Sequence, residues 1–368
     1  MAYIYKKKSF KMTSLNITYN LGALFEQEGE YGTSHLMEHL ICKTFKDEYA
    51  LLTKLDVTWN AYTTSEGIRV YFVGLDKYFT PEIKERLVSK LLGGLNISEE
   101  EFEAEKNVVL QEYMDSFNDP TSSLNILREK FNFYGPIGKR SDIEKFSYKD
   151  MKAKYKQFFT KPAKIVEVGP SQSNFSKVKF AEDYIVQPRR LKWKKAYKGV
   201  EFEQLPVNNK CDVEFIGKKM IKKADYPAMK IAIEMLAGGL ESPMYQEIRE
   251  KAHLTYGVGR GILKLLQDTL YSFDAVTDLE NKDKLIAEFN KFWTDIKSWL
   301  TKERFDDVIS SYYICDEKAK LFAYANVDEY LRKGLPRVGT SYKKLTFEKV
   351  VEVAEKYLNT DSFDLVVH

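Results

Sequence analysis

The pentapeptide His35-Leu36-Met37-Glu38-His39 is the stretch of this sequence on which both the fold assignment and the chemistry depend. On a helix, residues four positions apart lie on the same face, so His35 and His39 can reach one metal ion together. Zinc accepts imidazole ligands and, in a catalytic site, needs a third protein ligand and an open position for water. Glu38 lies beside His39 and can act as a general base on metal-activated water without binding the metal.

Histidine is rare in this chain, which makes a pair within one pentapeptide informative. The 368 residues contain four histidines, at positions 35, 39, 253 and 368. By chance, this pattern would arise on the order of once in a few hundred such chains. The alternative is two ordinary histidines on an amphipathic helix, and the pentapeptide alone leaves that alternative open.

A second segment offers carboxylates to the same site. Residues 98–117 are predicted to be helical, because Ser98 and Glu101 have the spacing of a capping box. Glu105 and Glu112 fall on nearly the same face of this helix, at about 100° per residue. Carboxylates on an apolar face are costly unless something compensates them, and a metal ion would do so. The alternative is that both glutamates are solvated. The apolar residues that we place on this face are Phe102, Val108 and Val109.

Strand-like and helix-like segments alternate in two halves of similar style. This mixture predicts an α/β (or α+β) protein built from two related domains. We expect a catalytic zinc-binding domain at 1–186 and a second domain at 200–368. The intervening residues 187–199 are rich in lysine and arginine. A nucleic-acid-binding patch would also be basic, but an exposed linker is the better interpretation because the rest of the chain is not basic.

The expected strands are 14–21, 57–73, 164–168, 213–216, 256–263 and 269–276. The expected helices are 149–159, 227–236, 243–251, 282–300 and one from 302 onward.

The composition indicates which kinds of partner and which cellular compartment to expect. Charged residues make up 30% of the chain and the formal net charge is only +3, so we expect no nucleic-acid partner. No apolar run approaches the length of a membrane span, so no membrane partner is expected. The three cysteines are far apart in the sequence, which predicts a reducing compartment. With no secretory signal at the start, these features predict a cytoplasmic protein.

The motif and its surroundings resemble the M16, or pitrilysin, family of zinc peptidases. His35-Leu36-Met37-Glu38-His39 is the inverted zinc motif of the inverzincins. The resemblance implies that the later glutamate, Glu112, completes the zinc site and that the earlier one, Glu105, supports catalysis. It leaves Cys42, three residues after His39, as a buried thiol and not a ligand. Further stretches that look like the family are Gly32-Thr33-Ser34, Asn60-Ala61-Tyr62-Thr63, 135–138 and 238–251.

The resemblance also implies roles for residues away from the metal. Arg249 and Tyr256 match the arginine and tyrosine that the family aims at the scissile carbonyl, where a cation and a phenol would stabilise an oxyanion. Asn60, Ala61 and Tyr62 match an edge strand that pairs with the substrate backbone. His253, between Arg249 and Tyr256, is expected to be an ordinary surface histidine.

A short, single-half member of this family is expected to contain two mostly antiparallel sheets flanked by helices. The resemblance implies a zinc-dependent endopeptidase that cleaves short or unfolded peptides inside an enclosed chamber. It also implies a dimer, for which we expect a homodimer and leave a heterodimer open. Some relatives are non-catalytic peptide-binding or structural subunits. Because the zinc motif and the Arg249–Tyr256 pair are both present here, the enzyme is favoured over that alternative.

Overall fold

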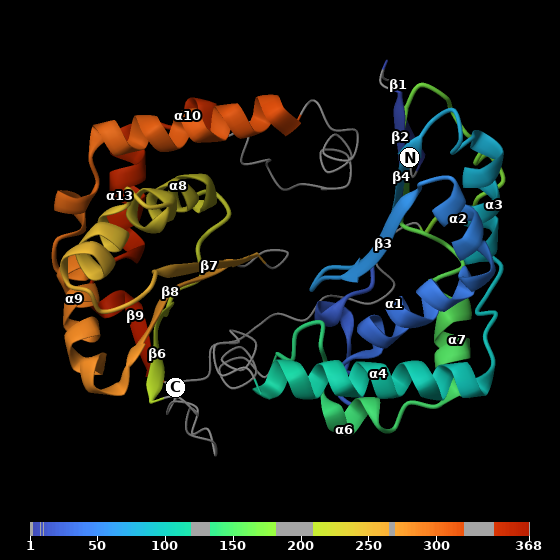
Figure 1. Cartoon of the computed structure of the whole chain (residues 1–368), viewed down its shortest axis with the longest axis horizontal. Coiled ribbons are helices and arrows are strands. Elements are labelled where there is room, and N and C mark those ends of the chain that lie inside the picture. The colour runs from blue at the N-terminus through green and yellow to red at the C-terminus, as the bar shows by residue number, and fades with distance from the viewer. Residues whose placement is uncertain are drawn as a thin grey trace. The chain divides into compact units, whose positions relative to one another are not determined.

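The computed structural model describes residues 3–7, 9, 11–118, 133–181, 209–264, 269–319 and 342–367. Residues 3–181 of this set form one compact unit, unit 1, and residues 209–318 with 342–367 form a second, unit 2 (Figure 1). The expected linker at 187–199 lies outside the described residues, so the domain boundaries stay a prediction. None of the helices in the described part is long and apolar enough to cross a membrane.

Unit 1 has a five-stranded sheet with helices packed on one face (Figure 1). The strand order is β1-β5-β2-β4-β3, and each neighbouring pair is antiparallel except β1 with β5. The strands are β1 (Tyr3–Lys7), β2 (Met12–Tyr19), β3 (Thr58–Thr63), β4 (Ile68–Leu75) and β5 (Lys164–Gly169). The helices are α1 (Thr33–Thr44), α2 (Tyr49–Lys54), α3 (Pro81–Leu92), α4 (Glu99–Asn118), α6 (Arg140–Ile143) and α7 (Tyr148–Phe158), with short turns at η1 (Ala23–Phe25) and η2 (Lys46–Glu48).

Apolar side chains at every second position of β2 and β4 form part of the core of unit 1. Leu15 lies opposite Phe72 and Ile17 lies opposite Val70 in the antiparallel register, and all four side chains are fully buried. Each such side chain contributes about 1.5–3 kcal/mol when it leaves water. The period-two pattern therefore fixes which face of the sheet the helices cover.

Strand β1 is tied to the sheet by a buried polar network that the sequence analysis did not predict. The Lys84 ammonium lies 2.7 Å from Glu167, and both side chains are fully buried. The Tyr3 hydroxyl donates to the Glu167 carboxylate, and the Tyr5 hydroxyl donates to the carbonyl oxygen of Gly169 at 3.0 Å. A buried ion pair is tolerated when hydrogen bonds satisfy its remaining polar atoms. Strand β1 has only five residues, and about half of them are polar. This network therefore helps to hold β1 against the sheet.

The start of α1 is fixed by a carboxylate and by a close glycine contact. Glu26 is buried and accepts hydrogen bonds from the backbone N–H groups of Gly32 at 2.9 Å and Ser34 at 2.7 Å. It thus caps the helix, whose first amides lack partners within the helix. Gly32 has φ +103°, and Gly138, with φ +79°, packs so closely that a Cβ on it would meet the Gly32 Cα at 2.3 Å. Helix α1 thus begins at Thr33, directly after Gly32.

Unit 2 has a four-stranded antiparallel sheet with helices on one face (Figure 1). The strand order is β7-β8-β6-β9. The strands are β6 (Lys210–Gly217), β7 (Gly259–Lys264), β8 (Thr269–Asp278) and β9 (Phe363–Val367). The helices are α8 (Tyr226–Ala237), η3 (Tyr245–Lys251), α9 (Lys282–Thr294), α10 (Lys302–Ala319) and α13 (Phe347–Tyr357), with short turns at η4 (Leu279–Asn281), η5 (Ile296–Trp299), η6 (Tyr342–Lys344) and η7 (Thr360–Ser362). Its core includes packed rings of Phe215, Phe273, Trp293 and Phe363.

The two sheets share one topology. Without β1, the order in unit 1 is β5-β2-β4-β3, and the order in unit 2 is β9-β6-β8-β7. In both, the first strand lies between the third and the last strand, and the second strand forms an edge. The predicted fold class is confirmed: an α/β protein with two mostly antiparallel sheets flanked by helices.

Three local predictions differ from the structure or are refined by it. Val108 is 42% exposed because it lies about 100° around α4 from the fully buried Val109, so its placement on the core face was wrong. The helix expected at 282–300 ends at Thr294 and continues only as the short turn η5. The segment expected as a helix at 243–251 forms a π-helix, η3, over Tyr245–Lys251.

The contact between Gly32 and Gly138 generates a stability prediction. Gly138→Ala should destabilise unit 1 by two effects, a left-handed backbone strain of about 1–2 kcal/mol and a steric clash of about 1–3 kcal/mol. Gly29→Ala is the matched control, because Gly29 has φ +84° and nothing within 4 Å of an added Cβ. Urea unfolding of both variants measures the difference. Equal losses of stability would show that the close contact does not constrain α1.

Candidate metal centre

Helices α1 and α4 bring three ligand atoms together. The Glu112 Oε2 atom lies 3.2 Å from His35 Nε2 and 3.6 Å from His39 Nε2. All three ligand atoms lie within 4.8 Å of one another. In a tetrahedral site with zinc bonds of about 2.0–2.2 Å, two ligand atoms lie about 3.3–3.6 Å apart. Two imidazoles and one carboxylate at these separations fit a zinc ion.

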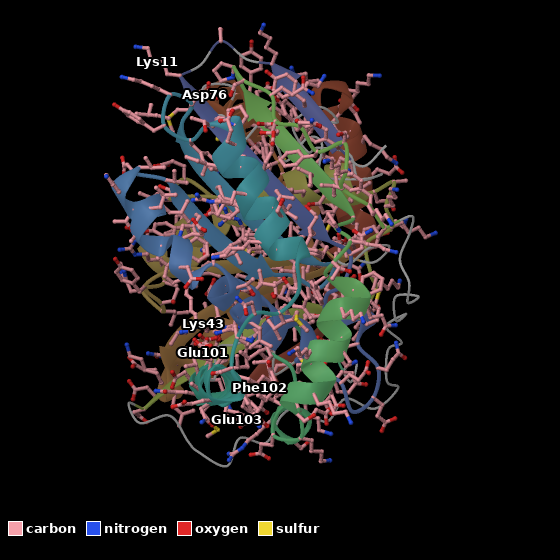
Figure 2. The ribbon with its side chains drawn as sticks, turned by 90° about the vertical axis from the view of Figure 1, so that its right-hand side faces the viewer. Lys11, Lys43, Asp76, Glu101, Phe102 and Glu103 are labelled. Carbon is pink, nitrogen blue, oxygen red and sulfur yellow. The ribbon has the colours of Figure 1, made fainter. Side chains whose placement is uncertain are left out.

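Glu105 contacts His39 at the ring nitrogen opposite the one that Glu112 approaches. Its Oε2 atom lies 3.1 Å from His39 Nδ1, and its Oε1 atom lies 3.0 Å from Lys43 Nζ. Figure 2 shows Lys43 beside the first turns of α4, near Glu101 and Phe102. A carboxylate that holds the far nitrogen of a metal-binding imidazole fixes the tautomer and the ring orientation. The geometry therefore separates two roles that the spacing left open, with Glu112 facing both rings and Glu105 supporting one of them.

His35 is in the protonation state that a metal requires. Burial and the neighbouring His39 lower the pKa of His35 to about 4. The ring is therefore neutral at physiological pH and presents a lone pair, which is the form that binds a metal ion. Its Nδ1 atom is buried and makes no hydrogen bond to any described residue.

Glu38 points to the end of strand β3. Its Oε2 atom accepts a hydrogen bond from the Thr63 hydroxyl at 2.8 Å. Burial raises the pKa of Glu38, while the bond from Thr63 opposes that rise. A carboxylate with a raised pKa is a better proton acceptor from water than an ordinary surface glutamate. No role for Thr63 was predicted from the sequence, although Thr63 is the last residue of β3, the strand that carries the predicted substrate-binding residues.

Strand β3 is at the edge of its sheet, as the resemblance implied. Among the strands that the structure describes, it pairs only with β4. The Ala61 N–H group donates to the side-chain oxygen of Asn60 at 2.9 Å. The Tyr62 ring lies 5.3 Å from the Arg69 guanidinium carbon. The open edge thus ends at Thr63, beside Glu38.

Arg249 and Tyr256 belong to unit 2, whereas the metal-facing residues belong to unit 1. The Arg249 guanidinium carbon lies 4.8 Å from the centroid of the Tyr256 ring, so the structure brings the predicted pair together. Tyr256 is 88% exposed, which leaves its hydroxyl accessible. His253 is exposed, as expected for a surface histidine.

Two family profiles match the sequence. The profile of the insulinase family (peptidase family M16) matches residues 2–132, and the profile of the peptidase M16 inactive domain matches residues 145–312. The chain belongs to the M16 peptidase family.

Relatives within M16 are similar along most of their length. Zinc protease PqqE of Helicobacter pylori is 23% identical, with 93% of this chain and 84% of PqqE covered. An uncharacterized zinc protease of Rickettsia bellii is 23% identical over 75% of this chain and 70% of its own length.

Solved structures show the same fold. A protease from Helicobacter pylori has a TM-score of 0.80 at 18% identity, with 99% of this chain and 96% of that chain covered. A peptidase M16 inactive domain from Pseudomonas fluorescens has a TM-score of 0.71 at 17% identity, with 99% of this chain and 94% of that chain covered.

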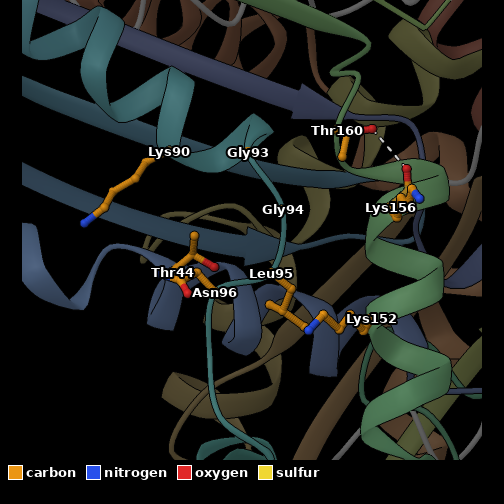
Figure 3. Close-up of a pocket in the computed structure, with 9 residues that line it drawn as sticks. All are labelled: Thr44, Lys90, Gly93, Gly94, Leu95, Asn96, Lys152, Lys156 and Thr160. Carbon is orange, nitrogen blue, oxygen red and sulfur yellow. Dashed lines mark hydrogen bonds between the residues drawn. The ribbon is translucent and has the colours of Figure 1, made fainter.

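Two other features of this M16 chain lie outside the candidate centre. Cys42 is half-buried, burial raises the pKa of its thiol to about 12, and among the described residues the group that could hold a metal is His35, His39 and Glu112, without Cys42. A hollow of about 610 Å³ lies where α1, α3 and α7 end (Figure 3). None of the predicted site residues lines it, so we assign it no part in the chemistry. It is lined by Thr44, Lys90, Gly93, Gly94, Leu95, Asn96, Lys152, Lys156 and Thr160.

The contact between Glu105 and His39 generates a prediction about zinc affinity. Glu105→Gln should weaken zinc binding by about 10–100-fold, since supporting carboxylates of this kind have effects of that size. Titration of the metal-free protein with zinc against a chelator measures the change. Glu103→Gln is the control, because Glu103 lies on the same helix and pairs with Lys106. If both variants bind zinc as tightly as the unaltered protein, Glu105 does not support the site.

Proposed function

We propose that this protein is a zinc-dependent endopeptidase that cleaves short or unfolded peptides. The observation that carries the proposal is the convergence of two imidazole nitrogens on one oxygen of Glu112, with Glu38 one residue from His39. Membership of the M16 family supports it, as do the relatives named zinc proteases.

The chain's own residues have distinct tasks in the proposed reaction. His35, His39 and Glu112 would hold the zinc ion. When bound, zinc supplies Lewis acidity that polarises the scissile carbonyl and lowers the pKa of water. Glu38 takes a proton from the attacking water and later delivers it to the leaving amine. Glu105 keeps the His39 ring oriented through its far nitrogen.

Substrate binding would use the open edge of β3. An extended peptide that pairs with this edge would take the place of the Asn60 side-chain oxygen at the Ala61 N–H group. Backbone pairing gives affinity with little dependence on side chains, which suits varied peptides. Arg249 and Tyr256 would donate hydrogen bonds to the oxyanion that forms when water adds to the carbonyl.

A non-catalytic subunit of an M16 assembly is the second candidate. Such a subunit could keep the fold and the open edge of β3 but would not need a general base. Here Glu38 is half-buried, hydrogen-bonded and beside the candidate metal ligands, which favours the enzyme. The cytoplasmic location remains part of the proposal, as does a dimer that encloses its substrate.

Glu38→Gln tests the proposed general base. The variant should keep its zinc, because Glu38 does not face the metal-ligand atoms as Glu112 does, while turnover should fall by about 10³-fold or more because no group accepts the proton. Metal analysis and cleavage of a quenched fluorescent peptide provide the two measurements. Equal cleavage by the variant and the unaltered protein would refute the role of Glu38.

Mixing two impaired variants tests whether the site is shared between subunits of a dimer. Glu38→Gln and Arg249→Ala should each lose about a hundredfold or more in activity alone. If Arg249 acts on the partner's zinc site, mixed dimers regain one working site, and statistical mixing restores roughly a quarter of full activity. If it acts within its own chain, every site keeps one defect and the mixture is no more active than the variants alone. Gel filtration of the mixture confirms that dimers are present.

A further inference from the structure

The Arg249 guanidinium lies between two tyrosine rings. Its central carbon is 4.7 Å from the ring centroid of Tyr245 and 4.8 Å from that of Tyr256. Both distances are within the range of about 6 Å in which a cation is attracted to an aromatic face. Tyr256 already has a proposed role in the reaction. Tyr245 has none, although it is as close to the cation.

The backbone that carries Tyr245 and Arg249 is unusual. The Ala252 N–H donates to the Glu247 carbonyl, five residues back, at 2.9 Å, and the Leu254 N–H donates to the Ile248 carbonyl, six residues back, at 3.1 Å. His253, with φ +54°, ends the π-helix in a left-handed conformation. π-helical segments are rare and occur often at functional sites. Such a backbone costs free energy and persists only where the surrounding structure holds it.

The two sides of this arrangement are anchored independently. Met244 and Ile248 are fully buried, and each directly precedes one of the stacked residues Tyr245 and Arg249. On the other side, the Thr255 hydroxyl donates to the Val276 carbonyl at 2.7 Å, which ties the loop before Tyr256 to strand β8. The backbone at Tyr245 and the backbone before Tyr256 are therefore each held by contacts of their own.

Contact with two ring faces restricts where the guanidinium can lie. The N–H groups of arginine point outward in the plane of the group, so they remain available as donors to a further partner. The Glu250 carboxylate oxygen lies 3.6 Å from Arg249 Nε, which is too long for a hydrogen bond. Glu250 therefore does not use the N–H donors of Arg249. Contact with the two rings holds the arginine side chain in few of its many rotamers.

We propose that Tyr245 is a positioning residue for Arg249, clamping the guanidinium against Tyr256 so that its N–H edge is presented to the substrate carbonyl. The inference rests on the proposed peptidase function. Because the oxyanion exists only during the reaction, loss of the clamp lowers kcat more than it raises KM.

Tyr245→Leu removes the ring, and Tyr245→Phe keeps it. The leucine variant should lose about 3–10-fold in kcat, and the phenylalanine variant should stay within about twofold of the unaltered protein. In an Arg249→Ala background, Tyr245→Leu should have no further effect, because the ring then has nothing to position. Tyr313→Leu is the control, since Tyr313 is half exposed and also lies beside a cation, Lys343, in the same unit.

A second measurement does not depend on catalysis. In the full chain labelled with ¹⁵N-arginine, the Arg249 Nε–H signal, assigned by its loss in Arg249→Lys, should be shifted by the ring currents of the two tyrosines. The shift should decrease in Tyr245→Leu and persist in Tyr245→Phe. If the unaltered protein cleaves no peptide while this signal behaves as expected, the proposed function is wrong and the stacking stands without its role. An active protein whose kcat and Arg249 signal are unchanged by Tyr245→Leu would overturn the clamp alone.

Discussion

The packing of α1 against α4 is the constraint on which the candidate site depends. A catalytic zinc site built on His35 and His39 needs a third protein ligand, and Glu112 approaches both rings from α4. The same helix supplies Glu105 to the opposite nitrogen of His39. Two carboxylates seven residues apart on one helix thus meet the same imidazole from two sides. A small rotation of α4 would lose both contacts together, which makes this helix pair a single functional element.

Contacts away from the candidate metal ligands fix α1 in the position that this packing needs. Glu26 satisfies the first amides of the helix, and the glycine contact between Gly32 and Gly138 sets how closely the loop before α6 approaches it. At the other side of α1, Glu38 is joined to β3 through Thr63. The general base that we propose and the edge that we propose for substrate are therefore linked by one hydrogen bond. In the function that we propose, this bond would couple the chemistry to peptide binding.

Most of unit 1's candidate site could be predicted from sequence, because its signals are local. Two histidines four apart fix one face of a helix, and the capping box at Ser98 and Glu101 fixes where α4 starts; both reciprocal bonds are present, at 2.9 and 3.1 Å. The separate tasks of Glu105 and Glu112 could not be predicted by spacing, because they depend on how two distant helices rotate against each other. Val108 was misplaced for a different reason, since it lies about 100° around α4 from the buried Val109. Strand β1 and the π-helix η3 were missed because tertiary contacts, not propensity, hold them.

The duplicated topology explains where the two sets of proposed functional residues lie. In unit 1, the connection from the first strand of the repeat, β2, to the edge strand β3 carries His35, Glu38 and His39. In unit 2, the equivalent connection, from β6 to the edge strand β7, carries Tyr245, Arg249 and Tyr256. An edge strand is where a sheet can accept another backbone, so residues just before it are placed to act on whatever binds there. In unit 1, this connection contains the regular helix α1 with its two imidazoles. In unit 2, it contains the π-helix η3 with the Arg249 guanidinium. The repeat thus supplies the same scaffold twice, and in the function that we propose the local backbone of each connection decides whether it would hold a metal ion or present a hydrogen-bond donor.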